Sequence, residues 1–170
     1  MQRKSTLAAI VATVAFCLGT PALAEGPANQ QDLLKALPSA KVTLQQGMAA
    51  SAKNGTPVSA KYELEEGTLQ LSVYTAKAGK FNEVIVDYTT GKVAKVKAIE
   101  DGEDLSHARA QTSALAKTHS PLHAAADKAE RENPGFRTVS LTPSLDSKQA
   151  VVQVVLARGG ETKTVSEKLE

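Results

Sequence analysis

The sequence predicts an α+β fold in which one unit, a helix packed on a small antiparallel sheet, occurs twice. Apolar and polar residues alternate from Val58 to Leu64 and again from Leu69 to Val73, which is the period of half-buried strands with one buried face and one wet face. Helical patterns precede the two groups of strands, near Thr43 and near Ser120. We therefore expect two lobes, each with a helix on one face of its sheet.

Residues 1–24 have the pattern of a secretory signal peptide. Two basic residues, Arg3 and Lys4, precede an apolar run that is too short to span a bilayer, and Ala22-Leu23-Ala24 is an A-x-A cleavage site. We predict cleavage between Ala24 and Glu25 and a periplasmic or secreted protein that does not span the membrane after cleavage.

The only cysteine, Cys17, lies within this segment. Phe16 precedes it, where lipid attachment would need a small residue, so we expect no lipid anchor. Two of the 20 basic residues are removed with the signal peptide, which leaves 18 basic against 18 acidic residues. A neutral chain without Trp has neither the charge nor the stacking surface that nucleic-acid binding uses, so we expect no nucleic-acid partner.

Residues 25–40 read as a leader, flexible over 25–31, followed by a short helix over Leu33–Leu37. Residues 41–98 form the first predicted domain. Its helix begins with a capping box, in which Thr43 and Gln46 can each bond the backbone of the other. Three strands follow, and the segment Asp87–Val93 closes the third.

Residues 99–119 read as an acidic linker and an Ala-rich helix through which the two domains could share an interface. Residues 120–170 form the second predicted domain. Ser120-Pro121 resembles a helix start with Ser as the cap, and strands are expected over 136–142, 149–158 and 161–168. Gly159-Gly160 is a strong hairpin signal between the last two. The repeated order indicates a tandem duplication.

The closing segment of the first domain has its own physical logic. Asp87 can accept hydrogen bonds from backbone N–H groups two or three residues on, and Gly91 can take a positive φ without a steric penalty. Thr90 can add a hydroxyl bond. We interpret Asp87, Thr90, Gly91, Lys92 and Val93 as a structural turn motif, with a contact surface for a partner as the alternative.

This layout resembles a PepSY domain, a module of peptidase propeptides and of exported bacterial proteins. The family's ending, an Asp, two variable residues, Thr-Gly-Lys and Val, matches residues 87–93. The resemblance covers residues 41–98 well and residues 120–169 only by layout, without the ending. It implies a non-catalytic domain that contacts or inhibits peptidases or acts as a binding module. Since no peptidase domain follows, a peptidase target would be a separate protein.

Motifs for catalysis are missing from the sequence: there is no mature Cys, no G-x-S-x-G, no H-E-x-x-H and no phosphate or dinucleotide loop. Glu63, Glu65 and Glu66 lie on the polar row of a strand or in its turn, where we expect solvation. We therefore predict no catalytic residues and no cofactor.

The three histidines do not suggest a metal site. His119 and His123 have the spacing of two ligands on one helix face, but the helix start between them predicts that they diverge, and His107 lies on another helix. The leading hypothesis is a periplasmic binding protein for a protein or peptide, such as a peptidase or an exported polypeptide, bound by strand addition. The alternative is a small-ligand or metal-ion binding protein.

Overall fold

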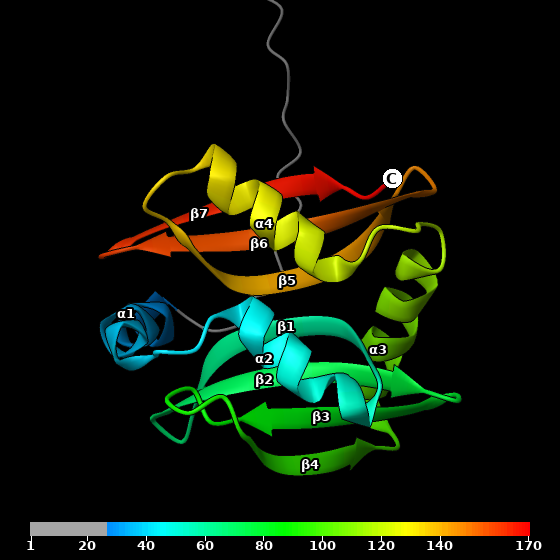
Figure 1. The fold of residues 1–170 in the computed structure, drawn as a ribbon, viewed down its shortest axis with the longest axis horizontal. Coiled ribbons are helices and arrows are strands. Elements are labelled where there is room, and N and C mark those ends of the chain that lie inside the picture. The colour runs from blue at the N-terminus through cyan, green and yellow to red at the C-terminus, as the bar shows by residue number, and fades with distance from the viewer. Residues whose placement is uncertain (1–26) are drawn as a thin grey trace, which may run out of the picture.

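The computed structural model describes residues 27–170 as a single seven-stranded antiparallel sheet with helices on both faces (Figure 1). The strand order is β4-β3-β2-β1-β5-β6-β7. The helices are α1 (Pro27–Ala36), η1 (Leu37–Ser39), α2 (Leu44–Ser51), η2 (Ala52–Asn54), α3 (Gly102–Leu115) and α4 (Leu122–Glu132). The strands are β1 (Thr56–Glu65), β2 (Thr68–Lys77), β3 (Lys80–Val86), β4 (Val93–Ile99), β5 (Arg137–Asp146), β6 (Gln149–Arg158) and β7 (Glu161–Lys168). The predicted α+β class is confirmed.

The two groups of strands join in one sheet, where the sequence predicted two separate sheets. β1 and β5, the first strand of each group, are neighbours but are in register only at Ala60 with Leu141 and at Lys61 with Ser140. β1 pairs with β2 along nearly its whole length. The seam between the groups is therefore narrow. The two-lobe description and the domain bounds 41–98 and 120–170 stay predictions.

Helices α2 and α4 lie side by side on one face of the sheet, each over the strands of its own group (Figure 1). On the helix faces expected to meet the core, Leu44 and Met48 of α2 and Leu122, Ala126 and Ala129 of α4 are buried. Ala52, expected on the same face as Leu44 and Met48, is exposed because the α-helix ends before it and η2 begins. They pack on the apolar rows of the strands to form one continuous core. The small side chains of α4 allow its backbone to lie close to the sheet.

The alternation of apolar and polar residues predicted that the opposite face of the sheet would be solvated, but a helix covers part of it. Helix α3 packs on it across both β1 and β5 and so covers the seam. Ser59, Ser72 and Ser140 lie on this face and are 6%, 0% and 5% exposed. Helix α3 therefore contacts strands of both groups, and its role as an interface between two lobes stays a prediction. Strand periodicity could not show the burial, because α3 meets these strands only through tertiary packing.

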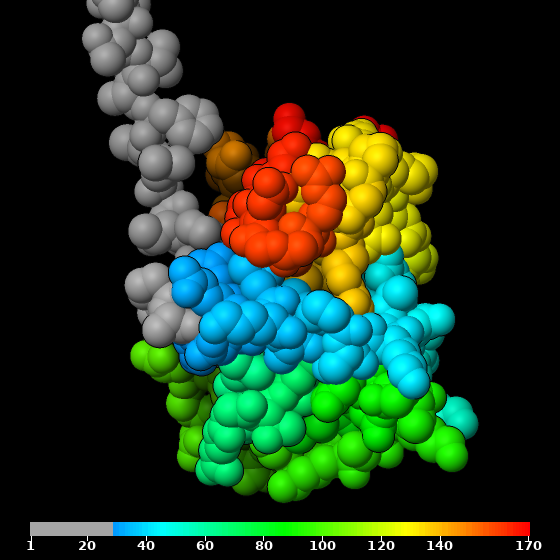
Figure 2. All heavy atoms as spheres, turned by 90° about the vertical axis from the view of Figure 1, so that its left-hand side faces the viewer, coloured from blue at the N-terminus to red at the C-terminus, as the bar shows by residue number. Residues whose placement is uncertain are grey.

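The segment predicted as a flexible leader, 25–31, is helical from Pro27 onward, and α1 continues to Ala36. Proline suits the first position of a helix, since its missing N–H would have no partner there. Leu33 in α1 and Leu37 in η1 are buried in the core. Figure 2 shows this blue segment crossing one end of the molecule between the strands of the two groups.

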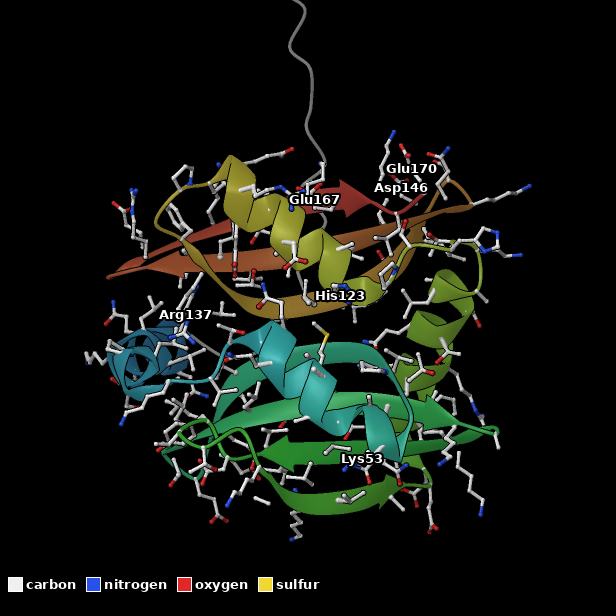
Figure 3. All side chains as sticks on the ribbon, viewed as in Figure 1. Lys53, His123, Arg137, Asp146, Glu167 and Glu170 are labelled. Carbon is white, nitrogen blue, oxygen red and sulfur yellow. The ribbon has the colours of Figure 1, made fainter. Side chains whose placement is uncertain are left out.

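Arg137, at the start of β5, holds this N-terminal segment in place. Its guanidinium donates hydrogen bonds of 3.2 Å to the backbone carbonyls of Leu37, Ala40 and Val42. It also donates to the Tyr62 hydroxyl over 3.1 Å and stacks on that ring. Figure 3 shows Arg137 beside α1, at the end of the sheet. One cation thus connects β1, β5 and the chain before α2.

The two predicted helix starts have different outcomes. The capping box of α2 is confirmed: the Gln46 N–H donates to the Thr43 hydroxyl at 3.1 Å, and the Thr43 N–H donates to the Gln46 side chain at 2.8 Å. Ser120 does not cap α4. Pro121 occupies the cap position without a side-chain bond, and the Ser120 hydroxyl donates to the Glu170 carbonyl at 2.6 Å. Ser120 therefore ties the C-terminus to the α3–α4 loop.

A fourth strand, β4, follows the Asp87–Val93 turn, where the first sheet was expected to end. Its pattern is hard to recognise because Val93 and Val96 are three residues apart and both are exposed. A bulge between Ile85 and Val86 of β3 accommodates this spacing. Strands β6 and β7 have the predicted bounds, whereas β3 ends at Val86, before Tyr88, and β5 runs on to Asp146. The Gly159-Gly160 hairpin joins β6 and β7 as expected.

The predicted signal peptide, its cleavage site and Cys17 lie outside the described residues. Over residues 27–170, none of the helices has the length and hydropathy needed to cross a bilayer.

Candidate functional site

The turn between β3 and β4 has the hydrogen bonds that its sequence predicted. One carboxylate oxygen of Asp87 accepts from the N–H groups of Thr89 and Thr90, each over 2.8 Å. These two bonds, that of Thr90 first, lower the pKa of Asp87. Gly91 has a φ of +74°, and the Thr90 hydroxyl accepts weakly from the Lys92 N–H at 3.4 Å. The turn sets where β4 begins.

The same turn is joined to the segment before α2. The Lys41 and Val42 N–H groups both donate to the Tyr88 carbonyl at 2.9 Å. The position of Gly91 is also next to the Val42 side chain. Since Arg137 bonds the carbonyl of Val42, the start of β4 is connected through short contacts to the seam of the sheet.

β4 forms one edge of the sheet, because it pairs with β3 and, within residues 27–170, with no second strand. In an antiparallel pair, alternate residues direct their N–H and C=O groups away from the partner strand, so β4 presents free backbone groups. Val93 and Val96 are 39% and 44% exposed. They are two of the three large apolar side chains exposed in the described chain, and the third is Leu145. The β4 edge thus offers free hydrogen-bonding groups and uncovered apolar surface together.

The charges beside β4 are basic. Lys92 and Lys95 are exposed, and Lys95 lies on the face of the sheet opposite to Val96, as its pairing with Ile85 shows. The Lys97 ammonium is already paired with Glu83 at 3.1 Å. An added strand would therefore meet apolar side chains on one face and an unpaired lysine on the other.

β7, at the other edge, is less suited to adding a strand. Its exposed residues are polar or charged, and its two inward residues, Val165 and Glu167, are largely covered. Gln30 of α1 donates to the Thr162 hydroxyl at 3.1 Å, near the start of β7. The Glu167 carboxylate is buried against α4 and accepts from Lys128. β4 is therefore the better candidate edge.

A cavity of about 330 Å³ lies between α3 and the seam of the sheet. Ser59, Lys61 and Glu63 of β1, Tyr74 of β2 and Ser140 of β5 form its sheet side, with Thr142 beside them. Asp104, His107 and Gln111 of α3 form the other side. A volume of this size is at the lower end of the range for small-molecule sites.

The cavity contains one strong ion pair. The Lys61 ammonium lies 2.5 Å from the Glu63 carboxylate and 5.8 Å from the centre of the Tyr74 ring. The Glu63 side chain is only 12% exposed, so the solvated glutamate that the sequence predicted is instead paired and half-buried. Burial, and then the nearby carboxylates of Glu63, Glu83 and Asp104, raise the pKa of Tyr74.

The three histidines lie in different places: His107 in the cavity under α3, His119 in the loop before α4, and His123 in the first turn of α4. Figure 3 shows His123 at the α4 end that faces α2. There it borders a second groove, of about 430 Å³, with Met48, Pro57 and Leu122. Over residues 27–170, no group of three His, Cys, Asp or Glu side chains is placed to hold a metal ion.

No protein-family model matches the chain, and no curated protein matches it. Among solved structures, the chain matches a protein from Clostridium difficile 630 described as a candidate lipoprotein. The two chains are 17% identical, the TM-score is 0.39, and the match covers 75% of this chain and 95% of that one. The function therefore has to be inferred from the residues themselves.

Sequence reasoning missed both candidate sites. β4 was hard to recognise because its apolar residues do not alternate, although the lysines in and just before it, Lys92, Lys95 and Lys97, are typical of an edge strand. The cavity under α3 had no sequence signal, because its residues come from four elements that are far apart along the chain.

Proposed function

We propose that the protein is a non-catalytic, exported binding protein of the PepSY type. It holds an extended segment of a partner polypeptide, such as a peptidase or an exported chain, as an added strand along β4. The observation that carries the proposal is the β4 edge, where free backbone groups lie beside exposed Val93 and Val96. Strand addition uses backbone bonds for affinity and side chains on alternate faces for specificity.

The charges define the partner segment. Exposed Lys95 favours acidic residues on one face of the added strand, and Val93 and Val96 favour apolar residues on the other. An extended segment that alternates apolar and acidic residues fits both. Complementary charge would speed association and set the register more than it would add affinity.

The PepSY assignment is supported by the order of α2, β1, β2 and β3 before the Asp87–Val93 turn. In the proposed function this turn has a positioning role, because it sets where β4 starts. The non-catalytic part of the proposal rests on the missing sequence motifs and on the pairing of Glu63 with Lys61, since a paired carboxylate is a poor general base.

A labelled peptide of alternating Val and Glu tests the edge directly. Fluorescence anisotropy should show binding to the purified protein, and Val96→Lys should weaken it by about tenfold, since burying one valine is worth roughly 1.5 kcal/mol or more. Leu145→Lys is the matched control, because it changes the third exposed apolar residue, far from β4 along the sheet. Equal losses in the two variants, or no binding at all, would overturn the assignment of the edge.

A protease assay tests the biological form of the proposal. Adding the protein to thermolysin that is digesting unfolded casein should slow cleavage, either by holding the substrate or by contacting the enzyme. Val96→Lys should restore the rate, whereas Leu145→Lys should not. Slower cleavage that persists in Val96→Lys would place the inhibitory surface elsewhere.

Export is tested by the intact mass of the processed protein. We expect a chain that starts at Glu25, because Ala22 and Ala24 are the small residues that signal peptidase requires. A mass that includes Met1, or one that includes a lipid on Cys17, would contradict export by this route.

A second candidate function, binding of a small molecule, is favoured by the cavity under α3.

A further inference from the structure

The cavity between α3 and the seam is lined on its sheet side by two serines. Ser59 and Ser140 line it and are 6% and 5% exposed. Neither hydroxyl is hydrogen-bonded to another group within residues 27–170, in contrast to Ser72, whose hydroxyl donates to Glu83 at 2.9 Å. Both hydroxyls are open to the cavity, so each can bond a molecule that occupies it.

The cavity is also electrically unbalanced toward negative charge. The Lys61 cation is neutralised by Glu63 at 2.5 Å and lies over the ring of Tyr74. Asp104, on the α3 side, has no ion-pair partner in the described chain. Burial is the main cause of the raised pKa of Tyr74, and the carboxylates of Glu63, Glu83 and Asp104 add to it.

We propose that this cavity binds a small organic cation that carries a primary amine or a guanidinium group. The Asp104 carboxylate would take the charge, and the hydroxyls of Ser59 and Ser140 would accept its remaining N–H donors. Ala108 of α3, which also lines the cavity, gives the methylene chain of such a molecule an apolar surface to pack on. This site is separate from the β4 edge and does not depend on the function proposed for that edge.

Calorimetric titration of the purified protein with agmatine and with putrescine tests the charge preference, with succinate as a dianion of comparable length. We expect both amines to bind with one site per chain and succinate not to bind. Binding of succinate that is as tight as that of the amines, or binding of none of the three, would overturn the proposal.

Variants then locate the site. Asp104→Asn should weaken amine binding by about tenfold or more, because it removes the charge that faces the ligand. Asp101→Asn is the matched control, since Asp101 is exposed at the start of the same helix and does not line the cavity. The double change of Ser59 and Ser140 to Ala should also weaken binding. If Asp104→Asn and the native protein bound the amines with equal affinity, the site would be contradicted. As a control for folding, the peptide of alternating Val and Glu should bind to Asp104→Asn as tightly as to the native protein.

Discussion

Arg137 and Tyr62 share one acceptor, the backbone carbonyl of Val42. The Arg137 guanidinium donates to it over 3.2 Å, the Tyr62 hydroxyl donates to it as well, and the same guanidinium lies 5.2 Å from the centre of the Tyr62 ring. β1, β5 and the chain before α2 therefore meet at one point. Since β1 and β5 share only two residue pairs, this contact stabilises a seam that the sheet itself holds weakly.

Removing either side chain should destabilise the protein. We expect Arg137→Met to lower the free energy of unfolding by about 1–3 kcal/mol, because three backbone carbonyls lose a donor, and Tyr62→Phe to lower it by about 1 kcal/mol. Urea denaturation of the two variants and of the double variant measures the coupling, which should be at least about 0.5 kcal/mol.

Arg158→Met is the control for this pair. Arg158 stacks on Phe136 and pairs with Glu161 at the surface, where its side chain is 53% exposed, so its removal should cost less than about 1 kcal/mol. If the Arg137 and Arg158 variants lost equal stability, the seam contact would not have the role described.

Gly91→Val should destabilise the protein by about 1–3 kcal/mol, because a β-branched residue is strained at a φ of +74°. The Val42 side chain is at an ordinary contact distance from an added Cβ, so the cost comes from the backbone. Gly160→Val is the control, since Gly160 lacks a positive φ and has open space around it; it should cost less than about 0.5 kcal/mol. Melting temperatures that shift equally would refute the backbone explanation.

Protonation of Asp87 should make the protein less stable in acid. Its pKa is lowered in the folded state, chiefly by the bond from the Thr90 N–H, so the stabilisation is complete above the unfolded pKa and is lost as the pH falls through the folded value. We expect Asp87→Asn to reduce the loss of stability between about pH 5 and pH 2. Acid titration followed by circular dichroism measures this, and identical pH profiles for the two proteins would count against it.

Titration with Zn²⁺ and Cu²⁺ at micromolar concentration should show no stoichiometric step. His107, His119 and His123 come from a helix, a loop and a second helix. Within residues 27–170, none of them belongs to a group of three His, Cys, Asp or Glu side chains that could hold a metal ion. A step that disappears in His123→Ala would instead favour the metal-ion alternative.

The sequence determined the features that depend on neighbours along the chain. The Thr43–Gln46 capping box, the Asp87 turn with Gly91, and the β6–β7 hairpin at Gly159-Gly160 all involve residues a few positions apart, and all have the predicted form. Their side chains and backbone contain the whole interaction, so local propensity decides the structure.

Only the tertiary structure decided the features that join distant segments. The fusion of both strand groups into one sheet, the burial of Ser59 and Ser140 under α3, the anchoring of η1 by Arg137 and the diversion of Ser120 to Glu170 pair residues from separate elements. Periodicity shows which face of a strand is apolar, but it does not show what covers the other face. Both candidate sites depend on such coverage: α3 covers the polar face over the seam and leaves a cavity there, whereas the free edge of β4 has no second strand beside it within residues 27–170.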